Sequence, residues 1–162
     1  MDAEIELKQL PAQLALVVHT PPGTLDTSME RMWDAVAVLT RHIEATGAQV
    51  VGPAFEYYPE PVEGEYSFAV GWPVGPGAVP GVDVSLEELP AAEAVTLLHK
   101  GPYEGIWPAW ERVQEWVAAN RRRPLDRQRP GGAPREVYLN DPREVEEAEL
   151  LTELVLPLAP QA

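Results

Sequence analysis

Apolar side chains recur along the chain with two different spacings, and these spacings predict the order of helices and strands. A spacing of three and four residues predicts a helix that starts with a capping box over residues 27–30 and ends before Gly47. The same spacing predicts a second helix over residues 105–120, with Pro108 in its first turn, where the missing amide costs nothing. The apolar stripes consist of Met29, Met32, Trp33, Val36, Leu39 and Ile43 in the first helix, and of Ile106, Trp110, Val113 and Val117 in the second. Each helix therefore has one face to bury.

Shorter apolar runs on either side of the two helices are typical of strands. The predicted strands cover residues 5–7, 14–18, 49–58, 66–74, 82–86, 93–98, 135–139 and 150–158. In the fourth of these, alternate side chains, which include Tyr66 and Phe68, share one face. Each helix lies between two pairs of strands along the chain. This order predicts an α+β fold with two helices and about eight mostly antiparallel strands.

The sequence repeats itself once, because Leu10 and its neighbours return at Leu89, and Pro53 and its neighbours return at Pro134. A long period with only two copies argues against a solenoid, whose repeats are shorter and more numerous. We expect a single domain over residues 1–162, made of two similar halves at 1–75 and 81–160 with a Pro- and Gly-rich seam between them. A pseudo-twofold axis would bring equivalent residues face to face around a central groove. The function is expected in that groove.

The composition favours a soluble protein of the cytoplasm. The chain has 162 residues and no cysteine, which excludes disulfides, thiolate metal sites and cysteine nucleophiles. Neither a secretory signal nor a run of 18 apolar residues is present, so no membrane span is expected.

The formal net charge of -14 disfavours direct binding to nucleic acid, because such a chain repels phosphate backbones. Six of the twelve basic residues nevertheless lie between Arg121 and Arg135. A solvated loop is the simpler interpretation, since Pro and Gly prevent a regular basic helix there. A docking patch for an acidic partner is the alternative.

Glu136 is the residue to which we assign the chemistry. In a strand over residues 135–139, Glu136 and Tyr138 share one face. When the copies are aligned on their shared prolines, Phe55 is equivalent to Glu136 and Tyr57 to Tyr138, so we expect a carboxylate among aromatic rings in the groove. Such a site suits an amphipathic cation, which rings attract by about 0.5 to 2 kcal/mol per contact and the carboxylate neutralises. A lone Glu in a strand is more often an ordinary surface residue.

Further aromatic residues are candidates for ligand contacts, although for any single one of them core packing is the better explanation. They are Tyr103, Trp107, Trp110, Trp33, Tyr66 and Phe68. No metal site is expected, because His19, His42 and His99 occur singly without a metal-ligand spacing. No nucleotide or dinucleotide motif and no nucleophile elbow occurs, so no cofactor is expected either.

Four motifs, taken in their order and spacing, resemble the GyrI-like small-molecule-binding domain, also called the AraC-type effector-binding domain. They are Leu89-Pro90-Ala91, His99-Lys100-Gly101-Pro102-Tyr103, Glu136-Val137-Tyr138-Leu139-Asn140-Asp141-Pro142 and Leu151-Thr152-Glu153-Leu154-x-x-Pro157-Leu158. The resemblance implies a duplicated strand-helix-strand-strand (SHS2-like) module with a ligand groove between its copies. It also implies that Glu136 meets cationic aromatic ligands, with Tyr138 and Tyr103 in the pocket. Because the resemblance starts at the first residues, we expect no helix-turn-helix reader of DNA in this chain.

Two functions follow from the same residues. The first is a stand-alone binding protein for hydrophobic, aromatic, often cationic compounds, used in multidrug sensing or sequestration. The second is a cofactor-independent hydrolase of electrophilic, cyclopropane-bearing genotoxins, an activity to which the family resemblance also points. In that case Glu136 would activate water, and Tyr138 or Tyr103 would assist. The sequence leaves both open.

Overall fold

A computed structural model describes residues 5–58 and 67–161 of the chain. It confirms the mixed α+β class, with two α-helices and one antiparallel sheet of eight strands among the described residues. The strands are β1 (Ile5–Leu10), β2 (Gln13–His19), β3 (Phe55–Tyr57), β4 (Ala69–Val74), β5 (Ser85–Leu89), β6 (Ala92–Lys100), β7 (Arg135–Tyr138) and β8 (Leu151–Pro157). The helices are α1 (Ser28–Thr46) and α2 (Ile106–Ala119), with short 3₁₀ turns η1 (Leu25–Thr27), η2 (Tyr103–Gly105) and η3 (Glu147–Glu149).

Both helices begin and end close to their predicted positions. Gly47 ends α1 in the left-handed region at φ 69°, a conformation that glycine adopts without steric cost. The predicted capping box is wrong, because the Thr27 hydroxyl donates to the Thr24 carbonyl at 2.9 Å and does not cap α1. The preceding 3₁₀ turn η1 leads directly into the helix and takes the place of the cap. Neither α1 nor α2 has the length and apolar character needed to cross a membrane.

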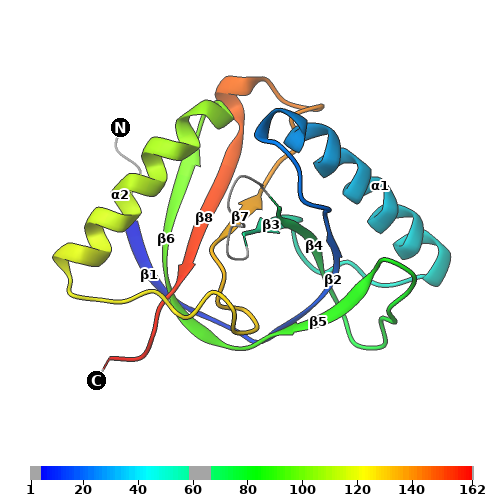
Figure 1. The fold of residues 1–162 in the computed structure, drawn as a ribbon, viewed down its shortest axis with the longest axis horizontal. Helices are drawn as coiled ribbons and strands as arrows, with labels where there is room; N and C mark the ends of the chain where they lie inside the picture. Colours follow the sequence, from blue (N-terminus) through cyan, green and yellow to red (C-terminus); the bar gives the residue numbers. More distant parts are fainter. Residues whose placement is uncertain (1–4, 59–66, 162) are drawn as a thin grey trace.

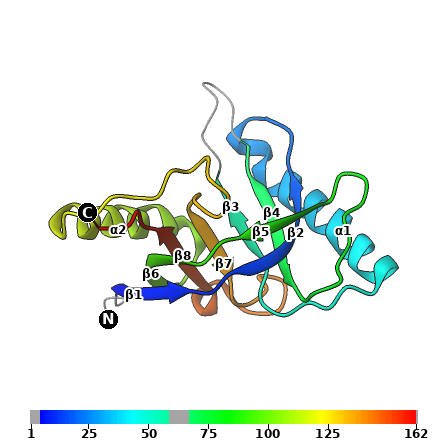
Figure 2. The same ribbon diagram turned by 90° about the horizontal axis from the view of Figure 1, so that it is seen from below.

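The strands lie in the order β1-β6-β8-β7-β3-β4-β2-β5, and every neighbouring pair is antiparallel. β7 and β3 form the centre of the sheet. The edge strands are exchanged along the sequence. The first strand, β1, pairs with the late strand β6, and β5, from the middle of the chain, pairs with the early strand β2. The sheet curls strongly, and α1 and α2 flank it on opposite sides of the curl (Figures 1 and 2).

One face of the sheet carries both helices. Under α2 lies a buried cluster that includes Leu97 and Leu154, and under α1 lies a second cluster that includes Leu16 and Val70. The cross-strand register places Val70 opposite Glu56 and Leu154 opposite Glu136. The face between the two helices is therefore apolar at both sides and acidic at its centre.

The other face has its own small core, in which Phe55 packs with Ala15, Val17, Ala69 and Leu89. Phe55 pairs across the strands with Gly71, and its ring lies directly over that glycine. A Cβ atom at position 71 would lie 2.6 Å from the Phe55 ring, closer than real Cβ contacts allow. The absence of a side chain at Gly71 is thus what lets Phe55 lie flat on the sheet.

Replacing Gly71 by alanine is expected to destabilise the fold by about 1 to 3 kcal/mol, the usual cost of overpacking a core. Chemical denaturation of Gly71→Ala measures this loss. Gly52→Ala is the matched control, because a Cβ there meets only Pro73 at an ordinary 3.4 Å. If both variants kept the stability of the parent protein, the packing of Phe55 on Gly71 would be incorrect.

Candidate functional site

Two glutamates lie side by side at the centre of the sheet. Glu56 of β3 and Glu136 of β7 are direct cross-strand partners, and both point to the face that carries the helices. Their exposed fractions are 6 % and 8 %, so both carboxyl groups are withdrawn from water. Buried acids of this kind require hydrogen-bond donors or a cation nearby.

Tyrosine and tryptophan side chains supply those donors. The Tyr58 hydroxyl lies 2.8 Å from Glu56 Oε2 and 3.0 Å from Glu136 Oε1. Glu136 also accepts from Trp110 Nε1 at 2.9 Å and from the Tyr138 hydroxyl at 3.3 Å. The two carboxyl groups are therefore linked through Tyr58, and Glu136 has the larger share of donors.

Burial shifts the acid–base properties of this cluster. It raises the pKa of Glu56 to about 7, a shift that Tyr58 opposes and the neighbouring Glu136 reinforces. Burial also raises the pKa of Glu136, against the hydrogen bonds from Trp110, Tyr58 and Tyr138. The pKa of Tyr138 is raised well above its ordinary value by burial and by the two acids, so this phenol stays protonated as a donor. With a pKa of about 7, Glu56 is thus partly protonated and partly ionised near neutral pH.

A cavity of about 130 Å³ opens beside the two acids, and we call it the carboxylate cavity. Its floor is formed by Glu56, Glu136, Tyr58 and Tyr138, and its walls by Ser28, Met29, Met32, Phe68, Tyr103 and Ile106. The walls include the first turn of α1 and the first residue of α2. Helix N-termini carry partial positive charge, which favours a carboxylate nearby. Met29 is half exposed, so the cavity has an apolar, adaptable rim.

Five of the residues selected from the sequence come together here. Glu136, Tyr138, Tyr103 and Phe68 line the carboxylate cavity, and the Tyr103 and Tyr138 rings meet edge to face at 5.9 Å. Trp110 reaches the same place through its indole N–H on Glu136. Phe68 is also part of the core under α1, with 2 % of its surface exposed.

The other aromatic candidates lie elsewhere. The expected common face of Phe55, Tyr57 and Glu136 is wrong, because the register pairs Glu136 with Glu56 and places Phe55 and Tyr57 in the core of the opposite face. Trp33 packs under the Arg143 guanidinium at 4.5 Å, and Trp107 is 75 % exposed; neither lines the carboxylate cavity. Tyr66 falls outside the described residues.

Glu56 and Tyr58 were missed, although the sequence contained a signal for both. If the second copy is shifted by a single position relative to the proline alignment, Glu56 becomes equivalent to Glu136 and Tyr58 to Tyr138. The alignment of Pro53 with Pro134 concealed these two identities. A slip of this size in a strand exchanges the two faces of the sheet. The slip therefore selected Phe55 and Tyr57 in place of their neighbours.

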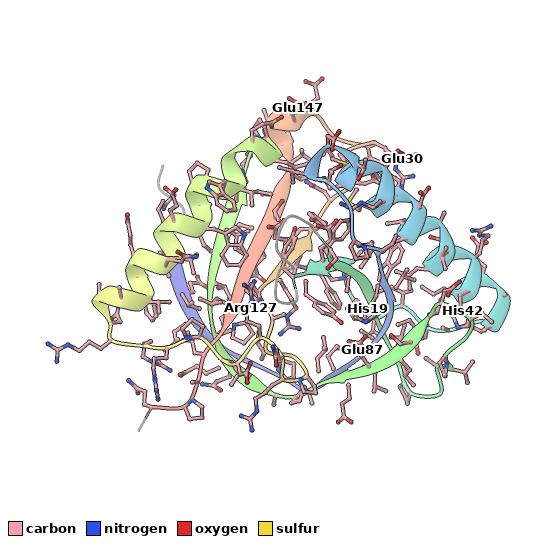
Figure 3. The ribbon with its side chains drawn as sticks, viewed as in Figure 1. His19, Glu30, His42, Glu87, Arg127 and Glu147 are labelled. Atoms are coloured by element: carbon pink, nitrogen blue, oxygen red, sulfur yellow. The ribbon has the colours of Figure 1, made fainter. Side chains whose placement is uncertain are left out.

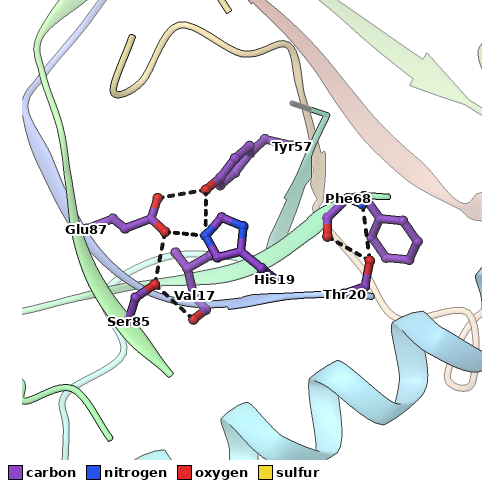
Figure 4. A network of polar contacts seen from close by, with 7 residues as sticks. All are labelled: Val17, His19, Thr20, Tyr57, Phe68, Ser85 and Glu87. Atoms are coloured by element: carbon purple, nitrogen blue, oxygen red, sulfur yellow. Dashed lines mark hydrogen bonds and ion pairs between the residues drawn. The ribbon is translucent and has the colours of Figure 1, made fainter. Parts of the chain in front are cut away.

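Tyr57 takes part in a second polar cluster, on the helix-free face (Figure 4). His19 Nε2 lies 2.7 Å from Glu87 Oε2, and the Tyr57 hydroxyl donates to Glu87 Oε1 at 2.7 Å. Ser85 Oγ donates to the same carboxylate at 3.0 Å. The Glu87 contact raises the pKa of His19 despite partial burial, which favours the protonated imidazole beside this carboxylate. No set of three or more His, Asp or Glu side chains suited to a metal ion occurs in residues 5–58 and 67–161.

Comparison with known proteins decides the family. The sequence profile of the GyrI-like small molecule binding domain matches residues 3–159, nearly the whole chain. The chain belongs to the GyrI-like family. No curated protein matches it significantly.

Solved structures share the GyrI-like fold at low sequence identity. The EcmrR C-terminal domain superposes with a TM-score of 0.82 at 20 % identity, covering 99 % of this chain and 100 % of that one. A hydrolase from Listeria innocua gives 0.67 at 16 % identity, covering 96 % and 92 %. SAV2435, solved bound to tetraphenylphosphonium, gives 0.62 at 12 % identity, covering 96 % and 94 %. At these identities the likeness concerns the fold alone.

Proposed function

We propose that this GyrI-like domain binds hydrophobic, aromatic, often cationic small molecules in the carboxylate cavity, for sensing or sequestration of such compounds. The observation that carries the proposal is the buried pair Glu56 and Glu136, held among tyrosine and tryptophan side chains next to an open cavity. An organic cation would neutralise the pair and face the aromatic rings. The chain's net charge of -14 favours approach of a cation and disfavours nucleic acid as a partner.

The size of the cavity limits what enters it. A cavity of roughly 150 Å³ in another protein holds benzene, so about 130 Å³ accepts one ring or one compact ammonium group. The remainder of a larger ligand would lie along the apolar rim at Met29, which is half exposed. Methionine adapts to ligands of different shape, which suits a site for varied compounds.

The protonation state of the two acids gives the proposal a measurable consequence. The single hydroxyl hydrogen of Tyr58 can donate to only one of the two acids at a time. If Tyr58 donates to Glu136, the short contact between Tyr58 and Glu56 is a hydrogen bond only when Glu56 is protonated and donates to the phenol oxygen. A pKa of about 7 for Glu56 agrees with this arrangement. A bound cation favours ionisation of both acids, so binding near neutral pH should release a proton.

Phenyltrimethylammonium is expected to bind more tightly as the pH rises from 6 to 8, by about tenfold, because Glu56 loses its proton over this range. Calorimetric titration in buffers of different ionisation enthalpy should detect release of up to one proton near pH 6.5. The neutral isostere tert-butylbenzene should show neither effect. Equal binding of the two compounds at all pH values would remove the basis of the proposal.

We also propose that the domain is a duplicated strand-helix-strand-strand module with copies at residues 1–75 and 81–160. The element order β-β-α-β-β occurs twice along the chain, and Glu56 and Glu136, which a repeat alignment with a lag of 80 residues would make equivalent, are cross-strand partners at the centre of the sheet. The exchange of the edge strands β1 and β5 would tie the copies into one domain. In this arrangement the duplication creates the acid pair, since each copy contributes one carboxyl group.

Hydrolysis of electrophilic compounds, cyclopropane-bearing genotoxins among them, is the second candidate function. The acid pair supports it: Glu136 would activate water, and Glu56, whose pKa burial raises to about 7, can accept or return a proton at neutral pH. The phenols of Tyr138 and Tyr103 could polarise the substrate. Incubation with a cyclopropane-bearing alkylator followed by mass spectrometry distinguishes the functions: a water adduct formed faster than in buffer, and lost in Glu56→Gln and Glu136→Gln, supports catalysis. A rate equal to that in buffer leaves binding alone.

A further inference from the structure

A larger pocket lies on the helix-free face of the sheet, on the opposite side of β3 and β7 from the carboxylate cavity. Its volume is about 700 Å³, within the range of small-molecule sites. Three arginines line it, Arg135 from β7 and Arg127 and Arg129 from the connection between α2 and β7. We call it the arginine pocket. Figure 3 shows Arg127, His19 and Glu87 inside the curl of the sheet, away from both helices.

The three arginines have no acidic partner among the described residues. No ion pair or hydrogen bond of their side chains occurs within residues 5–58 and 67–161. Arg135 Nε is buried without a hydrogen-bond acceptor in this part of the chain, an arrangement that proteins seldom leave unsatisfied. Burial lowers the pKa of Arg135, the shift expected where a guanidinium is withdrawn from water. Arg127 and Arg129 are exposed to solvent, so in a chain of net charge -14 the pocket gathers two exposed arginines and one partly buried one.

The acids in the lining do not supply the missing charge. Glu87 already makes hydrogen bonds with His19, Tyr57 and Ser85, and the described residues show no contact between its carboxylate and the three arginines. Burial alone would raise the pKa of Glu87, but the same hydrogen bonds lower it overall. They therefore stabilise the ionised carboxylate in its present position. Glu88 is exposed to solvent. The guanidinium groups of Arg127 and Arg129 are exposed as well and can therefore be reached by an anion from solvent.

The segment that carries Arg127 and Arg129 is fixed in place. Leu125 N–H donates to the Pro157 carbonyl at 2.9 Å, and Gly132 N–H donates to the Arg129 carbonyl at 2.9 Å. A Cβ at Gly132 would lie 2.0 Å from the Asp126 carbonyl oxygen, so the turn can close only with glycine there. The arginines thus stand on an ordered turn.

We infer that the arginine pocket is a second ligand site, for aromatic or aliphatic compounds that carry a phosphate or carboxylate group. Guanidinium groups bind such anions through paired N–H donors. The Tyr57 ring, Leu89, Pro130 and Ala133 supply an apolar lining for the body of the ligand. The site is independent of the carboxylate cavity, since Arg135 and Glu136 project to opposite faces of β7.

Calorimetric titration with 1-naphthyl phosphate, compared with neutral 1-naphthol, tests this inference. The phosphate should bind at least tenfold more tightly than the naphthol. Arg135→Gln should lower its affinity at least tenfold, and Arg129→Gln, on the connecting segment, provides a second variant that does not alter the sheet. Arg123→Gln, which lies outside the pocket, should change the affinity less than twofold.

Glu136→Gln separates the two sites. It should leave 1-naphthyl phosphate binding unchanged while it weakens phenyltrimethylammonium. If the phosphate and the naphthol bound equally, or if folded Arg135→Gln and Arg129→Gln kept the affinity of the parent protein, the second site would be ruled out. A loss of phosphate binding in Glu136→Gln would likewise place the anion elsewhere.

Discussion

Replacing Glu56 and Glu136 together by glutamine is expected to lower the affinity for phenyltrimethylammonium by about a hundredfold. Each buried carboxylate that faces a cation contributes about 1 to 3 kcal/mol, so each single variant should lose about tenfold or more. Glutamine keeps the volume of the side chain and can still accept from Tyr58 or Trp110, so the shape of the cavity is preserved. Calorimetry or quenching of tryptophan fluorescence measures the loss.

The matched control is Glu87→Gln, on the other face of the same sheet. Glu87 is also a strand glutamate with tyrosine and serine donors, but it lies outside the carboxylate cavity. Its replacement should leave cation affinity within twofold of the parent value. If Glu87→Gln were as damaging as Glu136→Gln, the effect would come from net charge and not from the cavity.

The second large effect concerns stability, which should increase when Glu56 becomes glutamine. The pKa of Glu56 is about 7 in the folded state and near the ordinary 4.5 when unfolded, so the folded protein binds the proton more tightly. The stability linked to that proton is fully present below about pH 4.5 and is lost as the pH rises to about 7. At pH 8 the loss approaches about 3 kcal/mol as an upper value, and Glu56→Gln should recover much of it.

Chemical denaturation at pH 5 and pH 8 tests this expectation. The difference in unfolding free energy between Glu56→Gln and the parent protein should be small at pH 5 and favour the variant at pH 8. Such a gain would mean that the ligand-free protein carries a destabilising acid pair, as functional sites commonly do. A difference independent of pH would show that Glu56 is not titrating in this range.

Much of the fold could be predicted because local signals agree with it. The apolar stripe of α1 and the glycine that ends it placed the helix close to its observed bounds, and α2 was similar. The predicted strand over residues 49–58 is an exception, since only Phe55–Tyr57 is a strand. Gly52 and Pro53 interrupt it, because Pro lacks the amide that a sheet ladder needs.

The site was predicted in part, and the remainder depended on register and packing. Glu136 and Tyr138 followed from alternation within one strand, whereas Glu56 required the two copies to be aligned in the correct register. The Trp110 hydrogen bond to Glu136 depends on how α2 packs on the sheet. Trp107, earlier on the same helix, faces solvent instead. Sequence spacing alone could not assign these two tryptophans to different surroundings.

A crystal structure of the protein with tetraphenylphosphonium, the ligand present in the SAV2435 structure, tests the central claim most directly. One phenyl ring should occupy the carboxylate cavity, with the phosphonium centre near Glu56 and Glu136 and the other rings along Met29. The same crystals of Glu56→Gln/Glu136→Gln should show no ligand there. A cation bound on the helix-free face, with the carboxylate cavity empty, would contradict the account.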